Sequence, residues 1–246
     1  MSYVDRPDAA RYQDRLDAAR TSPATFDPDT DEAHTEADGW HLDHHARDLP
    51  PEPPGEPLSD GSFAIARRIL RDYDFPDPRL ITGIYSADDP LEGRPMLLRA
   101  RFLAFTFWFA VRVSRVIDEV TDGPDGPTRV WGFGYYTLEG HFERGHITFT
   151  VRKALESGRV AVWIDAVSKP ERIRNPFYWL GFKLFGRRLQ LRFARTALDR
   201  IDRFVRQELA AQAVGTAPPE RETVEVKRPD AEARQELDTH RPAPET

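Results

Sequence analysis

The order of apolar and polar residues predicts a short helix, a run of strands and a long closing helix. Phe63, Ile69 and Leu70 recur at helical spacing, and Ser59 ahead of them carries the hydroxyl of an N-cap residue. After the turn-forming segment Asp74–Pro78 the pattern changes to alternation with aromatic and β-branched residues, which is typical of strands. The expected strands are Leu80–Ser86, Met96–Val120, Arg129–Thr137, Ile147–Lys153 and Arg159–Val167.

A long amphipathic helix is predicted from Asn175 to about Leu209. Phe193, Ala197 and Ile201 fall on one face at a period of 3.6, opposite a face rich in Arg and Asp. Consecutive strands followed by such a helix are typical of an α+β domain. We therefore expect a curved antiparallel sheet of five to seven strands wrapped around a long C-terminal helix, with an apolar cavity between the two.

The two ends of the chain differ in composition from its middle. Residues 1–57 hold 5 Arg or Lys against 14 Asp or Glu, residues 58–210 hold 25 against 19, and residues 211–246 hold 5 against 8. The acidic ends are rich in Pro and Asp and lack periodic apolar residues, a composition typical of disorder. We expect a disordered acidic tail over 1–38 apart from a short helix at Ala9–Arg20, a Pro-rich extended strap over 39–57, the α+β domain over 58–210 and a disordered tail over 211–246.

Composition narrows the classes of protein further. The chain has no cysteine, so it forms no disulfide and uses no thiolate. It begins with a charged segment rather than a signal peptide, and its most apolar window, Phe102–Val113, is about half the length that a membrane-spanning helix needs. Arg and Asp are interleaved in the core, without the basic stripe that nucleic acid requires. We expect a cytoplasmic protein with no nucleic-acid partner and no cofactor, and the pattern predicts no oligomeric state.

Several blocks of the sequence are distinctive when they are read in order. They are Gly61–Leu70, Arg115–Glu119, Trp131–Gly145, Ala166–Pro170 and Leu180–Arg195. Together they resemble an uncharacterised bacterial family, the domain of unknown function 1990, over about residues 40–210. The resemblance implies a START-like helix-grip fold and no established activity. The chain departs from the usual family pattern at Phe142, where proline is common, and at His146 and Ile147, where acidic residues are common.

Aromatic residues on two expected strands are the first candidate site. Phe105, Phe107 and Phe109 alternate along one expected strand, and Trp131, Phe133 and Tyr135 alternate along the strand expected beside it. They either line a ligand pocket, which would be mostly apolar with a few polar anchors, or pack the core. The candidate anchors are Arg112, Arg115, Tyr136 and Asp165.

Two groups of histidines are the remaining chemical candidates. His141 and His146 lie in a charged connection beside Glu139 and Glu143, where a histidine could transfer protons near neutral pH or simply satisfy a turn. The segment His41–His45, together with His34, spaces imidazoles as in some zinc sites, but it lacks the converging ligands of a rigid site. We therefore predict no metal site.

The segment Phe177–Arg188 combines aromatic residues with Lys183, Arg187 and Arg188. It could contact a membrane surface, cover the cavity as a lid, or pack as an ordinary helix against the sheet edge.

The leading interpretation is a non-catalytic binding module for a small hydrophobic or amphipathic ligand held between sheet and helix. One alternative is a cyclase- or hydrolase-like enzyme that uses His141 or His146 as general acid or base. The other is a protein-interaction module that recruits a partner through its acidic tails and Pro-rich strap.

Overall fold

The structure, a computed structural model, describes residues 6–27, 34–102, 105–170 and 176–217; of residues 6–11, 102, 105 and 176–186 it describes the backbone alone. The elements in chain order are α1 (Arg6–Thr21), the 3₁₀ turn η1 (Glu36–Asp38), β1 (His41–Leu49), α2 (Ser62–Arg71), β2 (Ile81–Ile84), β3 (Pro95–Phe102), β4 (Phe105–Gly123), β5 (Gly126–Thr137), β6 (Glu143–Ala154), β7 (Val160–Pro170) and α3 (Pro176–Ala213).

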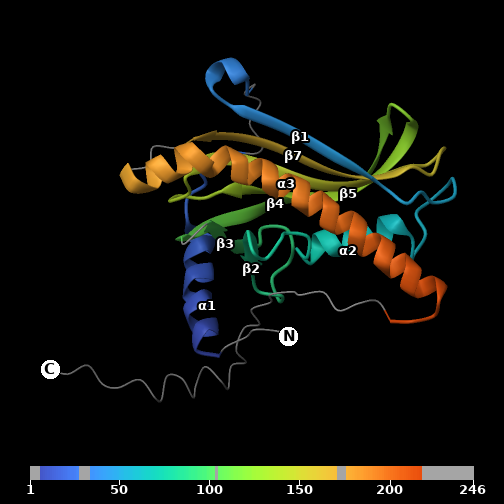
Figure 1. Cartoon of the computed structure of the whole chain (residues 1–246), viewed down its shortest axis with the longest axis horizontal. Helices are drawn as coiled ribbons and strands as arrows, with labels where there is room; N and C mark the ends of the chain where they lie inside the picture. Colours follow the sequence, from blue (N-terminus) through green and yellow to red (C-terminus); the bar gives the residue numbers. More distant parts are fainter. Residues whose placement is uncertain (1–5, 28–33, 103–104, 171–175, 218–246) are drawn as a thin grey trace.

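The described strands form a seven-stranded sheet in the order β1-β7-β6-β5-β4-β3-β2. All neighbouring pairs are antiparallel, and β4 carries an irregularity between Val113 and Val116. The curved sheet and the C-terminal helix α3, which crosses it, give the predicted α+β helix-grip architecture (Figure 1). The expected strand run is present with one difference: the segment Met96–Val120 is divided into the antiparallel strands β3 and β4. The strand β1 is added at the sheet edge beside β7.

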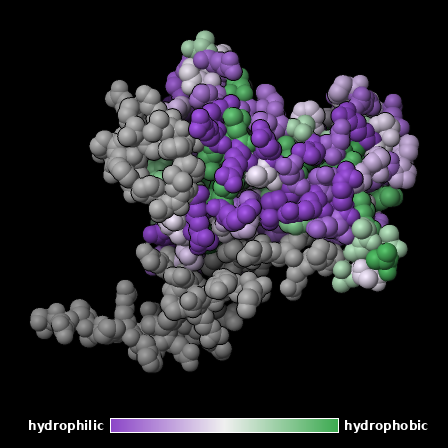
Figure 2. All heavy atoms as spheres, in the orientation of Figure 1, coloured by the Kyte–Doolittle hydropathy of each residue, from purple (hydrophilic) through white to green (hydrophobic). Residues whose placement is uncertain are grey.

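The inner face of the sheet, which faces α2 and α3, carries the main hydrophobic core. Val111, Val113, Phe149 and Val162 from the strands belong to one buried cluster with residues of both helices. The apolar stripe of α3 supplies Phe193, Ala197, Leu198, Ile201 and Val205 to this cluster. The face seen in Figure 2, which α3 crosses, is mainly hydrophilic, as expected for a helix with one buried side.

The outer face of the sheet is covered in part by α1. Leu16 of α1 is fully buried and forms a second cluster with Ile84 and Leu97, against which Tyr12 and Trp108 pack. Arg112 donates from Nη2 to the carbonyl oxygens of Ala19, Arg20 and Ser22, where α1 ends, at 2.7, 2.8 and 3.0 Å. The helix expected at Ala9–Arg20 is therefore slightly longer and is attached to the sheet.

The Pro-rich strap is held by a buried ion pair. Lys153 on β6 donates to Glu52 Oε2 at 2.8 Å and to the Glu56 carbonyl at 3.0 Å, with both charged side chains almost completely buried. Glu52 also accepts from the backbone N–H groups of Leu58, at 3.0 Å, and Phe63, at 2.8 Å. The expected N-cap at Ser59 is wrong: α2 begins after Gly61, which makes no side-chain cap, and the Glu52 carboxylate takes that role.

Within the described residues, no helix is long and apolar enough to cross a membrane.

Candidate functional site

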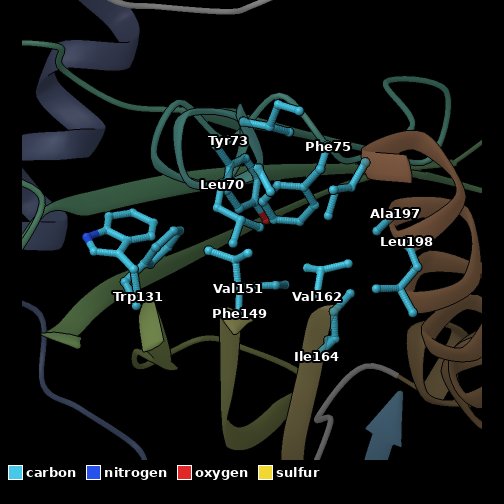
Figure 3. Packing of buried hydrophobic residues seen from close by; sticks show 14 of the residues in the cluster. Leu70, Tyr73, Phe75, Trp131, Phe149, Val151, Val162, Ile164, Ala197 and Leu198 are labelled. Carbon is cyan, nitrogen blue, oxygen red and sulfur yellow. The ribbon is translucent and has the colours of Figure 1, made fainter. Parts of the chain in front are cut away.

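The centre of the inner face is filled by side chains. Trp131, Phe133 and Tyr135 of β5 are buried there in the core cluster. Tyr73, Phe75 and Phe149 meet Trp131 and its neighbours from other parts of the chain (Figure 3). The rings of Phe75 and Phe149 are 4.8 Å apart, and those of Tyr135 and Phe149 are 5.6 Å apart. At this point the space between sheet and helices is packed core.

Two tyrosine hydroxyls meet inside this core. Tyr73 Oη and Tyr135 Oη are 3.4 Å apart. Burial raises the pKa of Tyr135 to about 12 and also raises the pKa of Tyr73, so both are neutral hydrogen-bonding groups. Tyr73 has a φ of 55°, and a Cβ at Gly83 would lie 2.4 Å from its ring, so a glycine on β2 makes room for it.

A set of partly buried aromatic rings lies on the same face, near the N-terminal end of β4. Phe107 and Phe109 have the strand parity of Val111 and Val113, and Phe109 packs against the core. The ring of Phe142 is 5.7 Å from Phe107 and 5.2 Å from Phe109, and the ring of His141 is 4.7 Å from Phe109. We call Phe107, Phe109, His141, Phe142 and Glu143 the rim cluster.

His141 is the neutral donor of the rim cluster. Burial lowers its pKa to about 4. Its Nδ1 accepts a hydrogen bond from the backbone N–H of Glu143 at 3.0 Å, so the ring proton of the neutral form sits on Nε2.

Glu143 is the group of the rim cluster that titrates near neutrality. Burial raises the pKa of its carboxyl to about 7, and this rise is opposed by the hydrogen bond from Gln190 and by the charge of Arg187. Gln190 on α3 donates to Glu143 Oε2 at 2.6 Å, while Arg187, one turn earlier, makes an ion pair with Asp43 of β1. The first described side chains of α3 therefore attach it to β6 and β1 through polar groups.

Three predicted anchors lie on the opposite, outer face of the sheet. Arg112 binds the end of α1 and lies 3.4 Å from Tyr136 Oη, and Asp165 bonds to His44 at 2.9 Å and Arg152 at 3.2 Å. Alternation along a strand separates them from the buried residues beside them in sequence. Arg115, at the β4 irregularity, is exposed.

The two loop histidines lie on opposite faces. His146 is on the outer side of β6, where Nε2 is 3.0 Å from Ser114 Oγ and Nδ1 is 3.4 Å from Thr148 Oγ1. Of the two, only His141 belongs to the inner-face rim cluster.

The remaining candidates fall as follows. The side chain of Phe105 lies outside the described residues, as do those of Phe177–Gly186 in the segment that could contact a membrane, cover a cavity or pack against the sheet edge. Along β1, His41 and His45 share one parity and His44 the other. Among the described residues, no three His, Cys, Asp or Glu side chains converge in the way a metal ion needs.

Sequence reasoning missed Tyr73 and Gln190. Gln190 could have been found, because it precedes Phe193 and Ala197 by three and seven residues and so shares the buried face of α3. Tyr73 continues the apolar spacing of Ile69 and Leu70, but the pattern does not predict its left-handed conformation after the last turn of α2.

The fold and the rim cluster define the class of protein: a helix-grip α+β domain with an aromatic and carboxyl-bearing group at one end of its inner face. The chain belongs to the family described as domain of unknown function DUF1990, whose model matches residues 28–200. No curated protein matches it.

Solved structures with a similar arrangement share little sequence with it. A norcoclaurine synthase point mutant from Thalictrum flavum, in complex with a transition-state analogue, is 10% identical with a TM-score of 0.43, over 69% of this chain and 96% of that one. A hypothetical protein from Helicobacter pylori is 11% identical with a TM-score of 0.41, over 74% of this chain and 99% of that one. Human STARD10 is 8% identical with a TM-score of 0.38, over 92% of this chain and 93% of that one.

Proposed function

We propose that the protein is a non-catalytic binding module that takes a small hydrophobic or amphipathic ligand at the rim cluster. The observation that carries the proposal is the set of half-exposed rings, Phe107, Phe109 and Phe142, beside two polar groups on the inner face. Binding sites for small molecules are mostly apolar with a few placed polar groups, and this composition fits.

The polar groups favour a ligand with a hydroxyl or carbonyl at one end. His141 offers a neutral N–H, and Glu143, whose pKa is raised by burial to about 7, donates when it is protonated and accepts when it is ionised. The apolar body of the ligand would lie against the phenylalanine rings.

The first experiment is native mass spectrometry of the protein purified from its natural host, followed by release and identification of what is bound. We expect an apolar passenger at a one-to-one ratio. In Phe107→Asp the passenger should be lost, because a carboxylate among the rings must be desolvated when the ligand binds.

The matched control is Thr106→Asp, which places the same charge one residue earlier on the same strand, at an exposed position. Retention of the passenger in both variants would contradict the site. An empty protein that also resists a panel of fatty acids, isoprenoids and polyketides would contradict the function.

A second candidate is an enzyme in which the rim cluster transfers a proton. The pKa of about 7 favours Glu143 for this role over His141, whose pKa of about 4 makes it a weak base. Once the ligand is known, comparison of the wild type with Glu143→Gln distinguishes the two functions. With a binding module both proteins leave the ligand unaltered, whereas with an enzyme the wild type converts it and the variant does not.

A further inference from the structure

A pocket of about 600 Å³ lies beside α2, and the rim cluster contributes nothing to its wall. Four arginines line it: Arg67, Arg68 and Arg71 from α2 and Arg129 from β5. Leu58 and Phe63 are among the apolar residues of the same wall, and Leu58 is 45% exposed. The pocket therefore combines a cationic wall with an apolar one.

The residues that line this arginine pocket include more basic than acidic groups. Glu56 is the single acidic residue of the described wall, against the four arginines. The carboxylates that pair with the arginines are not among the lining residues: Asp118 pairs with both Arg67 and Arg129, Glu208 with Arg68, and Asp72 with Arg71. The arginine side chains are nevertheless 29–57% exposed.

The wall is held in place before any ligand arrives. Arg67 and Arg71 are four residues apart on α2 and so share a face, and the guanidinium of Arg67 also lies 5.2 Å from the ring centre of Trp131. The strap side is fixed because Leu58 donates its N–H to Glu52 and the Glu56 carbonyl accepts from Lys153. A preorganised set of donors loses less entropy when it binds an anion.

We propose that the arginine pocket binds a phosphate monoester that carries an apolar group. Guanidinium groups bind phosphate oxygens with two parallel hydrogen bonds, and a phosphate offers several arginines of one wall more acceptor oxygens than a single carboxylate does. Leu58 and the apolar wall beside it would contact the organic group. This site is separate from the proposed inner-face ligand and does not depend on it.

The test is calorimetric titration of the full-length protein with three probes: inorganic phosphate, phenyl phosphate and phenol, each against sodium chloride at the same ionic strength. Phenyl phosphate should bind at one site about tenfold more tightly than inorganic phosphate, because its ring buries apolar surface, and phenol should not saturate. Arg71→Gln and Arg67→Gln should each weaken phenyl phosphate binding about tenfold, since one charge-assisted hydrogen bond is lost.

The matched control is Arg79→Gln, which removes an arginine of equal charge that is also paired with a carboxylate close by in sequence, Asp77, but lies outside the pocket. This variant should bind like the wild type. Far-ultraviolet circular dichroism of each variant separates a lost site from a lost fold.

Sedimentation with vesicles that contain phosphatidic acid shows whether the phosphate ester is a lipid headgroup or a free small molecule. Vesicle binding that Arg71→Gln abolishes supports the site with a lipid headgroup as its ligand. Saturation by phenyl phosphate without vesicle binding supports it with a free phosphate ester. Absence of both, or unchanged binding in Arg71→Gln and Arg67→Gln, overturns the proposal.

Discussion

Glu143 makes the stability of the folded protein depend on pH in a direction unusual for a carboxyl group. Its folded pKa of about 7 lies above the ordinary value of 4.5, so between these values the folded state holds a proton that the unfolded state has released. Stability from this group is therefore lost as the pH rises from about 4.5 to 7. His141 acts in the opposite direction: its pKa falls from 6.5 to about 4, so its contribution grows as the pH rises through that window.

The variant Glu143→Gln should separate the two effects. Relative to the wild type, its free energy of unfolding should increase steadily between about pH 4.5 and 7 and level off above, because it no longer places an ionising carboxyl in a buried site. Urea unfolding at half-unit pH steps measures this difference.

Glu139→Gln, at an exposed position of the same connection, controls for the loss of one carboxyl. If the free energies of unfolding of Glu143→Gln and the wild type differ by the same amount at every pH from about 4.5 to 7, the pKa of Glu143 is not raised.

The sequence predicts which face of the sheet a residue occupies only where polar and apolar residues alternate without a bulge. Phe107 and Phe109 follow the parity of the buried valines, and the pattern predicts their side. After the irregularity at Val113–Val116 the parity changes, so that Val116 again packs toward the core. A bulge of this kind leaves no clear trace in the order of residue types. Arg112 has the parity opposite to Phe107 and Phe109, and neighbours in a strand face opposite ways, so the alternation itself argues against Arg112 as an anchor on the inner face.

Among the elements, the strap depends most on a single interaction, the pair of Glu52 and Lys153. Lys153→Met should destabilise the protein by about 3–5 kcal/mol, because it leaves a carboxylate buried with two backbone donors and no cation. Equilibrium unfolding in urea measures the change.

The double variant Glu52→Gln with Lys153→Met should recover part of this loss, since Gln can still accept from Leu58 or Phe63 without carrying a charge. If the double variant is less stable than Lys153→Met alone, the carboxylate is not the source of the penalty.

Apart from the short helix at Ala9–Arg20, the predicted elements are those with a clear apolar period. The strands from β2 to β7 and the helices α2 and α3 have one buried face each, and the sequence shows it. β1 has no apolar face: its inner side meets α3 through ion pairs such as Asp43–Arg187 and Arg47–Asp199, and its outer side is exposed. A strand held by backbone pairing and charges cannot be recognised from hydrophobic alternation.

In the whole molecule the sheet is packed on both faces, by α1 on one and by α2 and α3 on the other. We expect a substitution on one face to leave the local stability of the other face unchanged. Arg112→Gln removes the donor to three carbonyl oxygens at the end of α1. Amide hydrogen exchange in α1 should rise about tenfold, while α3 and the inner strands keep their protection, because hydrogen bonds from a charged donor contribute about 1.5–3 kcal/mol.

Arg115→Gln, an exposed arginine of the same strand, is the comparison variant and should leave α1 unchanged. Faster exchange in both α1 and α3 would show that the two layers unfold together.

The pairing of β1 with β7 joins His41 to Ser168, so the edge of the sheet is closed by segments more than a hundred residues apart. Loop closure over that length is slow, and chains dominated by such distant pairings fold late. On the ribosome, His41–Leu49 would leave the exit tunnel long before its partner strand exists. Its charged, histidine-rich sequence is suited to that interval, because an unpaired strand without an apolar face has little tendency to associate with other chains. The polarity that conceals β1 in the sequence would thus keep the nascent chain soluble until synthesis reaches β7.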